Sequence, residues 1–273
     1  MGTDTGNESA IFREAAAHLM RGEGHRVWSL IVTIFGDLAQ APGQGISGAA
    51  LSRLVGLMGV KPEAMRVALH RLRKDGWIES ERAGRGSQHA LTPYGRAQSA
   101  AASPRIYDRT RVFPETWHLL IAGSGEASGR GQLDSFLMTG DYLPIGQQVL
   151  LAPGPLPETP TGLMGVETGR RSVPGWLRDQ VCPPAVMAQY AALDRDFASL
   201  SGVSDGADDL SLWERTALRL LIVHSWRRLL FRHPDLPEDF FPHGWPGPRC
   251  RERFCTLMEV LAAPSVDDIE AAP

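Results

Sequence analysis

The apolar and polar positions between residues 62 and 92 predict a helix followed by a two-stranded hairpin. Four apolar residues recur at the i, i+3, i+4 and i+7 spacing of one helix face: Met65, Ala68, Leu69 and Leu72. Pro62 suits a first helical turn, and Gly76 suits a left-handed helix end. Strand-type residues then occupy 77–82 and 88–92, on either side of a turn at 84–87.

The opposite face of this predicted helix is mostly cationic. At 100° per residue, Glu63, Val67, His70 and Lys74 lie roughly opposite the apolar stripe, and Arg66, Arg71 and Arg73 flank them. The candidates for DNA contact here are Lys61, which precedes the helix, Arg66, Val67, His70, Arg71 and Lys74. Arg85 lies at the predicted hairpin tip between two glycines, so its side chain can approach a phosphate or the floor of a minor groove. A lone surface Arg is more often simply solvated, but the preceding basic helix favours binding. We expect these seven residues to contact DNA.

Two apolar helices are predicted upstream. One has its apolar face between residues 26 and 39, and the next begins at Ser47, an N-cap residue type, and runs to Gly59. Residues 59–61 then form a tight turn before the basic helix. Three helices followed by a hairpin are typical of a winged helix-turn-helix, in which the third helix enters the major groove.

The later pattern predicts two further modules of an α+β, multidomain chain. A connector helix begins at Pro93, and residues 117–122, 132–138, 148–151 and 162–166 predict a strand, a helix and two strands, which is the beginning of a ferredoxin-like unit. Helices are predicted at 185–200, 210–231 and 247–261, with a proline- and aromatic-rich loop packed between the last two. We expect domains at 26–108, 109–175 and 176–264, with tails at 1–25 and 265–273.

Charge is unevenly distributed along the chain. The formal net charge of the 273 residues is −3, which by itself argues against a nucleic-acid partner. Residues 53–111 nevertheless hold twelve Lys or Arg against five Asp or Glu, a local charge of +7 that leaves −10 for the rest. Such a split is expected when one module faces phosphates and the others do not.

Composition favours a protein of a reducing compartment. Cys182, Cys250 and Cys255 are an odd number at spacings unlike a disulfide framework. The first ten residues lack the features of a secretory signal, and no apolar run approaches the ~18 residues that span a bilayer. We expect a cytoplasmic protein without a membrane partner.

Enzyme functions are less well supported. The sequence has no cysteine-enzyme signature, and neither a G-x-S-x-G elbow nor a glycine-rich nucleotide motif occurs between a predicted strand and a predicted helix, so no cofactor and no catalytic residues are implied. Cys250 and Cys255, with His233 and His243, are an alternative zinc site, but their spacing places the two thiols on different helix faces. We therefore expect buried thiols and no metal.

Several motifs together resemble the phenylacetic-acid-degradation repressors, the PaaX-like family. They are WSLIVTIFGD at 28–37, VALHRL at 67–72 with DGW at 75–77, LTP at 91–93 with Gly95, LPED at 236–239 and GWPG at 244–247. The resemblance extends from about residue 26 to residue 264. It implies a homodimeric bacterial transcriptional repressor with an N-terminal winged helix, a middle ferredoxin-like domain similar to Cas2 proteins, and a C-terminal helical domain.

The resemblance also implies an effector, because family members are released from their operators by aryl-CoA thioesters such as phenylacetyl-CoA. No motif identifies the effector site of this chain. Arg227, Arg228 and Trp245 are candidates, since two cations suit a phosphate-bearing ligand and an indole suits stacking, although packing and surface charge explain each of them equally well. Two alternatives stay open: a DNA-binding adaptor without an effector, and a metal-dependent nuclease built on the Cas2-like domain.

Overall fold

The computed structural model describes residues 9–20, 27–84, 86–125, 127–202 and 209–273. The chain forms two compact units. Unit 1 combines Met1–Arg109, Tyr190–Arg228 and Pro246–Pro273, and unit 2 combines Thr110–Gln189 and Leu229–Trp245. These units group the chain differently from the three contiguous domains expected from the sequence, and that division stays a prediction.

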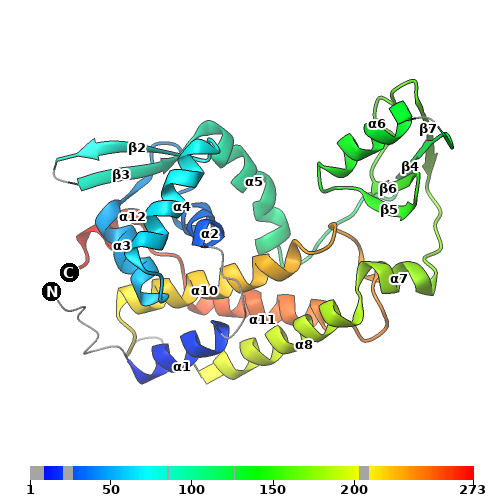
Figure 1. Ribbon diagram of the computed structural model, residues 1–273. Helices are drawn as coiled ribbons and strands as arrows, with labels where there is room; N and C mark the ends of the chain where they lie inside the picture. The colour runs from blue at the N-terminus through cyan, green and yellow to red at the C-terminus, as the bar shows by residue number, and fades with distance from the viewer. Residues whose placement is uncertain (1–8, 21–26, 85, 126, 203–208) are drawn as a thin grey trace. The chain divides into compact units, whose positions relative to one another are not determined.

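The first part of unit 1 contains the predicted helices and hairpin (Figure 1). Its helices are α2 (Val27–Leu38), α3 (Gly48–Leu57), α4 (Pro62–Lys74) and α5 (Pro93–Tyr107). Its three strands, β1 (Gly45–Ser47), β2 (Ile78–Ala83) and β3 (Gly86–Leu91), form an antiparallel sheet in the order β1-β3-β2. The helix and hairpin predictions are confirmed, whereas β1 was not predicted because three residues are too short for a recognisable alternation.

Local chemistry explains where α3 and α4 begin and end. The Ser47 hydroxyl accepts a hydrogen bond from the Ala50 N–H, as an N-cap should. Gly76, just beyond α4, has a φ of +72°, a conformation that glycine adopts at low cost. All four residues of the predicted apolar stripe of α4 are buried. The opposite face of α4 is therefore oriented outward.

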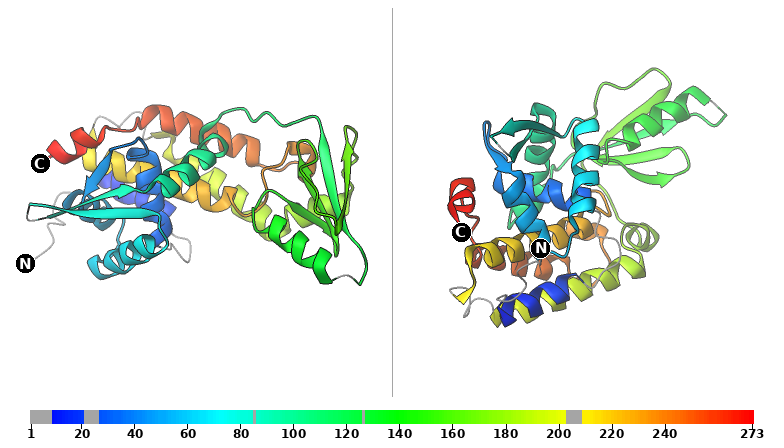
Figure 2. Two further views of the ribbon diagram at one scale, coloured as in Figure 1. Left: turned by 90° about the horizontal axis from the view of Figure 1, so that it is seen from above. Right: turned by 60° about the vertical axis from the view of Figure 1, so that its left-hand side comes forward.

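The later part of unit 1 is helical. It contains most of α8 (Pro184–Ser199), η1 (Leu200–Gly202), most of α10 (Leu212–Leu230), α11 (Gly247–Val260) and α12 (Val266–Ala271), and α1 (Ala10–Leu19) joins it from the other end of the chain. Figure 2 shows α8, α10 and α11 side by side. Rings of these three helices meet in the core, where Trp226 packs edge-on to Tyr190 and stacks on Phe254.

Two stretches interpreted from the sequence as tails carry packed helices. α1 buries Phe12 and Leu19, and the Ser9 N–H donates to the Glu214 carboxylate at 2.6 Å. α12 buries Val266 and Ile269, and its Glu270 carboxylate accepts from the Ser47 N–H at 2.6 Å. Both helices are short and obtain their stability from contacts far away in the sequence, so local periodicity did not reveal them.

Unit 2 is built on a four-stranded antiparallel sheet. Its strands are β4 (Trp117–Ala122), β5 (Leu143–Gly146), β6 (Val149–Pro153) and β7 (Leu163–Thr168), in the order β5-β6-β4-β7, and α6 (Ala127–Leu137) follows β4. One core cluster combines Trp117 with Leu177 of α7 (Gly175–Val181) and with Phe240 of η3 (Glu238–Phe240). A second cluster contains Leu133 of α6. The α+β class is thus confirmed, with two small antiparallel sheets.

Candidate nucleic-acid interface

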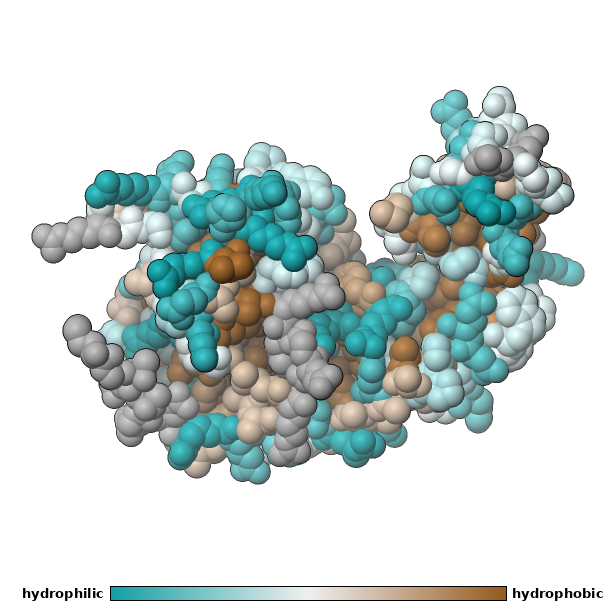
Figure 3. Space-filling model, in the orientation of Figure 1, coloured by the Kyte–Doolittle hydropathy of each residue, from teal (hydrophilic) through white to brown (hydrophobic). Residues whose placement is uncertain are grey.

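The exposed face of α4 carries the predicted DNA-contacting residues. Lys61, Arg66, Val67, His70, Arg71 and Lys74 are all exposed. Arg85, the predicted hairpin tip, lies outside the described residues. Figure 3 shows hydrophilic side chains over much of the surface around α4 and the β2–β3 hairpin, with small hydrophobic patches between them. With Arg73, which is also exposed, five Lys or Arg and one His are accessible between residues 61 and 74.

The two arginines of this face are held differently. The Arg66 guanidinium lies 2.9 Å from the Glu63 carboxylate, and the two side chains are 69% and 73% exposed. Such a surface ion pair contributes only about 0–1 kcal/mol, so Arg66 can exchange Glu63 for another acceptor. The Arg71 guanidinium lies 5.4 Å from the centre of the Trp28 ring and 3.5 Å from the Asp75 carboxylate. Arg71 is therefore held against α2 by the Trp28 ring, while its exposed pair with Asp75 is as exchangeable as that of Arg66.

The two lysines lie at opposite ends of the same helix. Lys61 is the N-cap residue of α4 and Lys74 is its last residue. No other lysine occurs in the chain. Within the described residues, neither ammonium group has an ion-pair partner, and neither does the imidazole of His70. These groups are available to a polyanion at both ends of α4.

A buried histidine stabilises the hairpin beside α4. His89 of β3 is 5% exposed, and its two ring nitrogens lie 2.7 Å from Ser80 Oγ and 2.9 Å from Ser87 Oγ. Burial and the nearby Arg73 lower the pKa of His89, so the ring is neutral near pH 7. The bond to Ser80 links β3 to β2, whereas the bond to Ser87 lies within β3, and a neutral ring can donate one of these bonds and accept the other. Sequence reasoning missed this residue, because a lone histidine in a strand carries no recognisable motif.

A buried ion pair joins the two parts of unit 1. Arg219 of α10 makes a bidentate contact with Asp37 of α2, at 2.7 and 2.9 Å, and the two side chains are 9% and 1% exposed. The Tyr107 hydroxyl donates to the same carboxylate at 2.6 Å, and Arg219 also donates to the Leu261 carbonyl at 2.7 Å. Burial and the Asp37 carboxylate raise the pKa of Tyr107. One carboxylate thus connects α2, α5, α10 and the end of α11.

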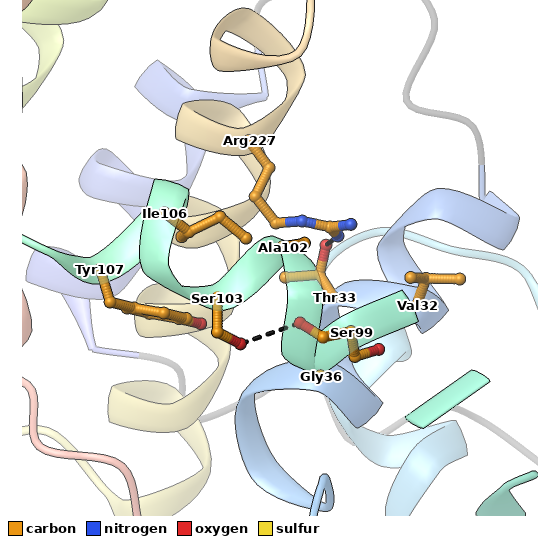
Figure 4. Close-up of a pocket in the computed structure, with 9 residues that line it drawn as sticks. All are labelled: Val32, Thr33, Gly36, Ser99, Ala102, Ser103, Ile106, Tyr107 and Arg227. Carbon is orange, nitrogen blue, oxygen red and sulfur yellow. Dashed lines mark hydrogen bonds between the residues drawn. The ribbon is translucent and has the colours of Figure 1, made fainter. Parts of the chain in front are cut away.

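Two of the three effector candidates lie in unit 1. The Arg227 guanidinium donates to Thr33 Oγ1 at 2.6 Å beside a small cavity between α2, α5 and α10 (Figure 4). The cavity volume is about 20 Å³, which fits about one water molecule. Ser99 Oγ lines it and has no hydrogen-bond partner, so a water molecule is the expected occupant. Arg228 is half-buried on the same helix.

The third candidate, Trp245, belongs to unit 2 and packs there. Its ring stacks on Phe241 with 3.6 Å between the ring centres and an angle of 6° between the planes. Unit 2 also has a pocket of about 410 Å³, lined by Arg111, Phe113, His118 and Tyr142 among others. Within it, the His118 ring bonds the Gly154 carbonyl and the Tyr142 hydroxyl, each at 3.0 Å. A volume of this size lies within the usual range of small-molecule sites.

The remaining sequence expectations concern thiols, metals and membranes. Cys182, Cys250 and Cys255 are free and buried, as expected, and burial raises the pKa of each thiol. In the part of the chain that the structure describes, no group of three or more His, Cys, Asp or Glu is arranged to hold a metal ion. The helices of that part are all too short or too polar to cross a bilayer.

Comparison with known proteins identifies relatives of both parts of unit 1. Residues 26–95 match the family model described as PaaX-like protein, and residues 184–271 match the model of the PaaX-like protein C-terminal domain. The first match contains every residue of the candidate interface. The chain is also 26% identical over 258 residues to the transcriptional repressor PaaX of Escherichia coli strain K12, covering 86% of this chain and 80% of the relative.

A solved structure supports the fold. An uncharacterised protein from Mycobacterium tuberculosis is 21% identical, with a TM-score of 0.50, and the match covers 89% of this chain and 97% of that protein. At this identity the likeness concerns the fold alone. The two family models together cover more than half of the chain, and with the repressor relative they show that the chain belongs to the PaaX-like family, a family of transcriptional regulators and not of enzymes.

Proposed function

We propose that the chain is a sequence-specific DNA-binding repressor of an aromatic-acid catabolic pathway, released from its operator by an aryl-CoA thioester. The observation that carries the proposal is the exposed cationic face of α4, which is backed by a buried apolar stripe. The repressor relative in Escherichia coli supports the regulatory role. Family membership supports phenylacetate as the regulated pathway.

The finer architecture belongs to the same proposal. α2, α3 and α4 with the β2–β3 hairpin are the three helices and the wing of a winged helix-turn-helix. A helix of 13 residues is ~20 Å long, which suits a major groove ~12 Å wide. Counted in chain order within unit 2, the strands lie in the order 2-3-1-4, and this order supports a ferredoxin-like, Cas2-like domain. The three-domain division at 26–108, 109–175 and 176–264 follows from this architecture.

Each residue of the interface has a proposed role. Arg66 reads a base edge, because a guanidinium can bond O6 and N7 of guanine together. Arg71, Lys61 and Lys74 hold phosphates, and Arg85 at the hairpin tip reaches the backbone or the minor groove. Two copies in a homodimer would bind an inverted-repeat operator, with half-sites one helical turn or a multiple of it apart.

The lysine content of the chain provides a direct test of this interface. Lys61 and Lys74 are the lysines of the chain and both lie at the ends of α4, so an amine-acylating reagent reports on this surface. We expect saturating duplex DNA to slow acylation of both lysines several-fold, because a phosphate contact shields the ammonium group from the reagent. Mass spectrometry of the digested protein measures the two rates.

An added lysine-containing peptide corrects for any effect of DNA on the reagent. High salt should restore both rates, since contacts to phosphate weaken steeply with ionic strength. Equal acylation of both lysines with and without saturating duplex would exclude α4 as the DNA-binding surface.

A thermal-shift experiment tests the effector. A thioester that binds only the folded protein, present at a concentration 100 times its dissociation constant, adds ~2.7 kcal/mol to the free energy of unfolding. For a chain of this size that raises Tm by roughly 5–10 °C. We expect phenylacetyl-CoA or a related aryl-CoA to give this shift, whereas free CoA and free phenylacetate at the same concentration give less. Binding of duplex DNA without a shift from any thioester would favour the adaptor without an effector.

A further inference from the structure

Val67 is an apolar side chain in the middle of the cationic face of α4. It is the sixth residue of the helix and is 70% exposed. Its exposed neighbours on the helix surface are Glu63, His70 and Arg71, at the i−4, i+3 and i+4 positions. Val67 lies on the face of α4 opposite the buried stripe.

Helix stability does not account for a valine at this position. A β-branched side chain loses rotamer freedom in a helix and is a weaker helix former than Ala, Lys or Arg. A single exposed apolar residue is common on protein surfaces, so its exposure alone indicates nothing. What distinguishes Val67 is its place: it lies in the N-terminal half of α4, the part of a recognition helix that reaches base edges.

The chemistry of the major groove then restricts what Val67 can contact. The groove edges of guanine, cytosine and adenine present hydrogen-bond donors and acceptors, whereas thymine also presents its C5 methyl group. A valine pressed against a donor or acceptor would remove water from that group without replacing the hydrogen bond, which is unfavourable. A methyl group has no hydrogen bond to lose.

We infer that Val67 packs its γ-methyl groups on the C5 methyl of a thymine and makes one A·T pair in each half-site a determinant of specificity. The inference rests on the proposed DNA-binding function and adds to it the identity of a base. Val67 supplies the apolar part of the readout, while Arg66 beside it supplies hydrogen bonds. Arg66 and Val67 project about 100° apart around the helix, so they would contact different parts of the site.

Replacement of thymine by deoxyuridine tests this inference, since it removes the C5 methyl and leaves the base pair intact. The full chain first selects binding sites from a random duplex library, and each thymine of the selected site is then replaced in turn. We expect one thymine per half-site at which the replacement weakens binding about fourfold, corresponding to ~0.8 kcal/mol for one buried methyl-sized group. With Val67→Ala the same replacement should change binding by less than about twofold.

Two further variants make the comparison specific. Val67→Thr keeps one methyl group and should retain part of the discrimination between thymine and deoxyuridine. Val112→Ala removes a more exposed valine, 86% accessible and in unit 2, and should keep the full effect. Melting curves of all variants establish that each is folded, which is expected because Ala is a better helix former than Val.

The outcomes separate this inference from the proposed function. In one outcome the wild type selects a sequence and yet loses no more affinity than Val67→Ala when any thymine is replaced by deoxyuridine. In that case the inference is wrong and the DNA-binding function stands. If the folded wild type neither selects a sequence nor binds duplex DNA, the proposed function fails and the inference fails with it.

Discussion

Replacement of Asp37 by Ala is expected to destabilise the protein by about 3–5 kcal/mol, because it leaves the Arg219 guanidinium buried without its counter-charge. The Tyr107 hydroxyl loses its acceptor in the same variant. For a chain of this size such a loss lowers Tm by roughly 10 °C. Chemical denaturation monitored by fluorescence measures the change in the free energy of unfolding.

A second variant shows whether Asp37→Ala loses stability because Arg219 is left buried without a counter-charge or because a favourable contact is lost. Replacing a buried ion pair by apolar residues of similar volume is often nearly neutral, so Asp37→Leu combined with Arg219→Met should recover much of the stability that Asp37→Ala loses. Glu259→Ala is the matched surface control: its carboxylate pairs with Arg109 and is 70% exposed, so the expected cost is about 0–1 kcal/mol. A cost for Asp37→Ala no larger than that of Glu259→Ala would show that the pair contributes little to unit 1.

This ion pair also explains why the sequence did not predict which segments of the chain make up unit 1. Asp37 and Arg219 are 182 positions apart, and each is an ordinary charged residue at the edge of a helical pattern. Periodicity identifies the buried face of a helix but not the helix against which that face packs. The chain returns to unit 1 twice, and the contacts that join its segments are between residues far apart in the sequence.

Elements with a long and regular pattern were predicted well. Ser47, Pro62 and Gly76 mark bounds of α3 and α4. Each acts on the backbone within a few residues, so the sequence alone reveals its effect. The four-residue β5, which contains Pro144, and the three-residue β1 carry too few alternating positions to be recognised. β1 pairs with the distant β3, and β5 forms a short, irregular hairpin with β6 directly after it.

The candidate interface was partly predictable for the same reason. Exposure of the basic residues of α4 follows from the apolar stripe on the opposite side, and the Glu63–Arg66 pair has the i,i+3 spacing of helix neighbours. The contact between Trp28 and Arg71 joins two helices and could not be deduced from spacing. The effector candidates are divided between the two units, since Arg227 bonds Thr33 in unit 1 whereas Trp245 packs in unit 2, and their role stays a prediction.

Arg66→Ala is expected to abolish the preference of the protein for one base pair in each half-site. A bidentate contact between Arg and guanine contributes ~1–3 kcal/mol of discrimination, so affinity for a selected site should fall by roughly 5- to 150-fold. Affinity for random duplex DNA should fall much less, because it depends on total charge. Parallel titrations of the selected and the random duplex measure the ratio of the two dissociation constants.

Two matched variants separate base reading from charge. Lys74→Ala should weaken binding to both duplexes by a similar factor and reduce the dependence of log K on log salt by ~0.9, the value for one lost phosphate contact. Glu63→Ala releases Arg66 from its exposed ion pair and should leave the specificity ratio intact or raise it, since Arg66 then reaches the base edge without first breaking a contact. An equal loss on both duplexes with Arg66→Ala would reassign Arg66 to the phosphate backbone. Base reading by the α4 face would then depend on His70 and Val67.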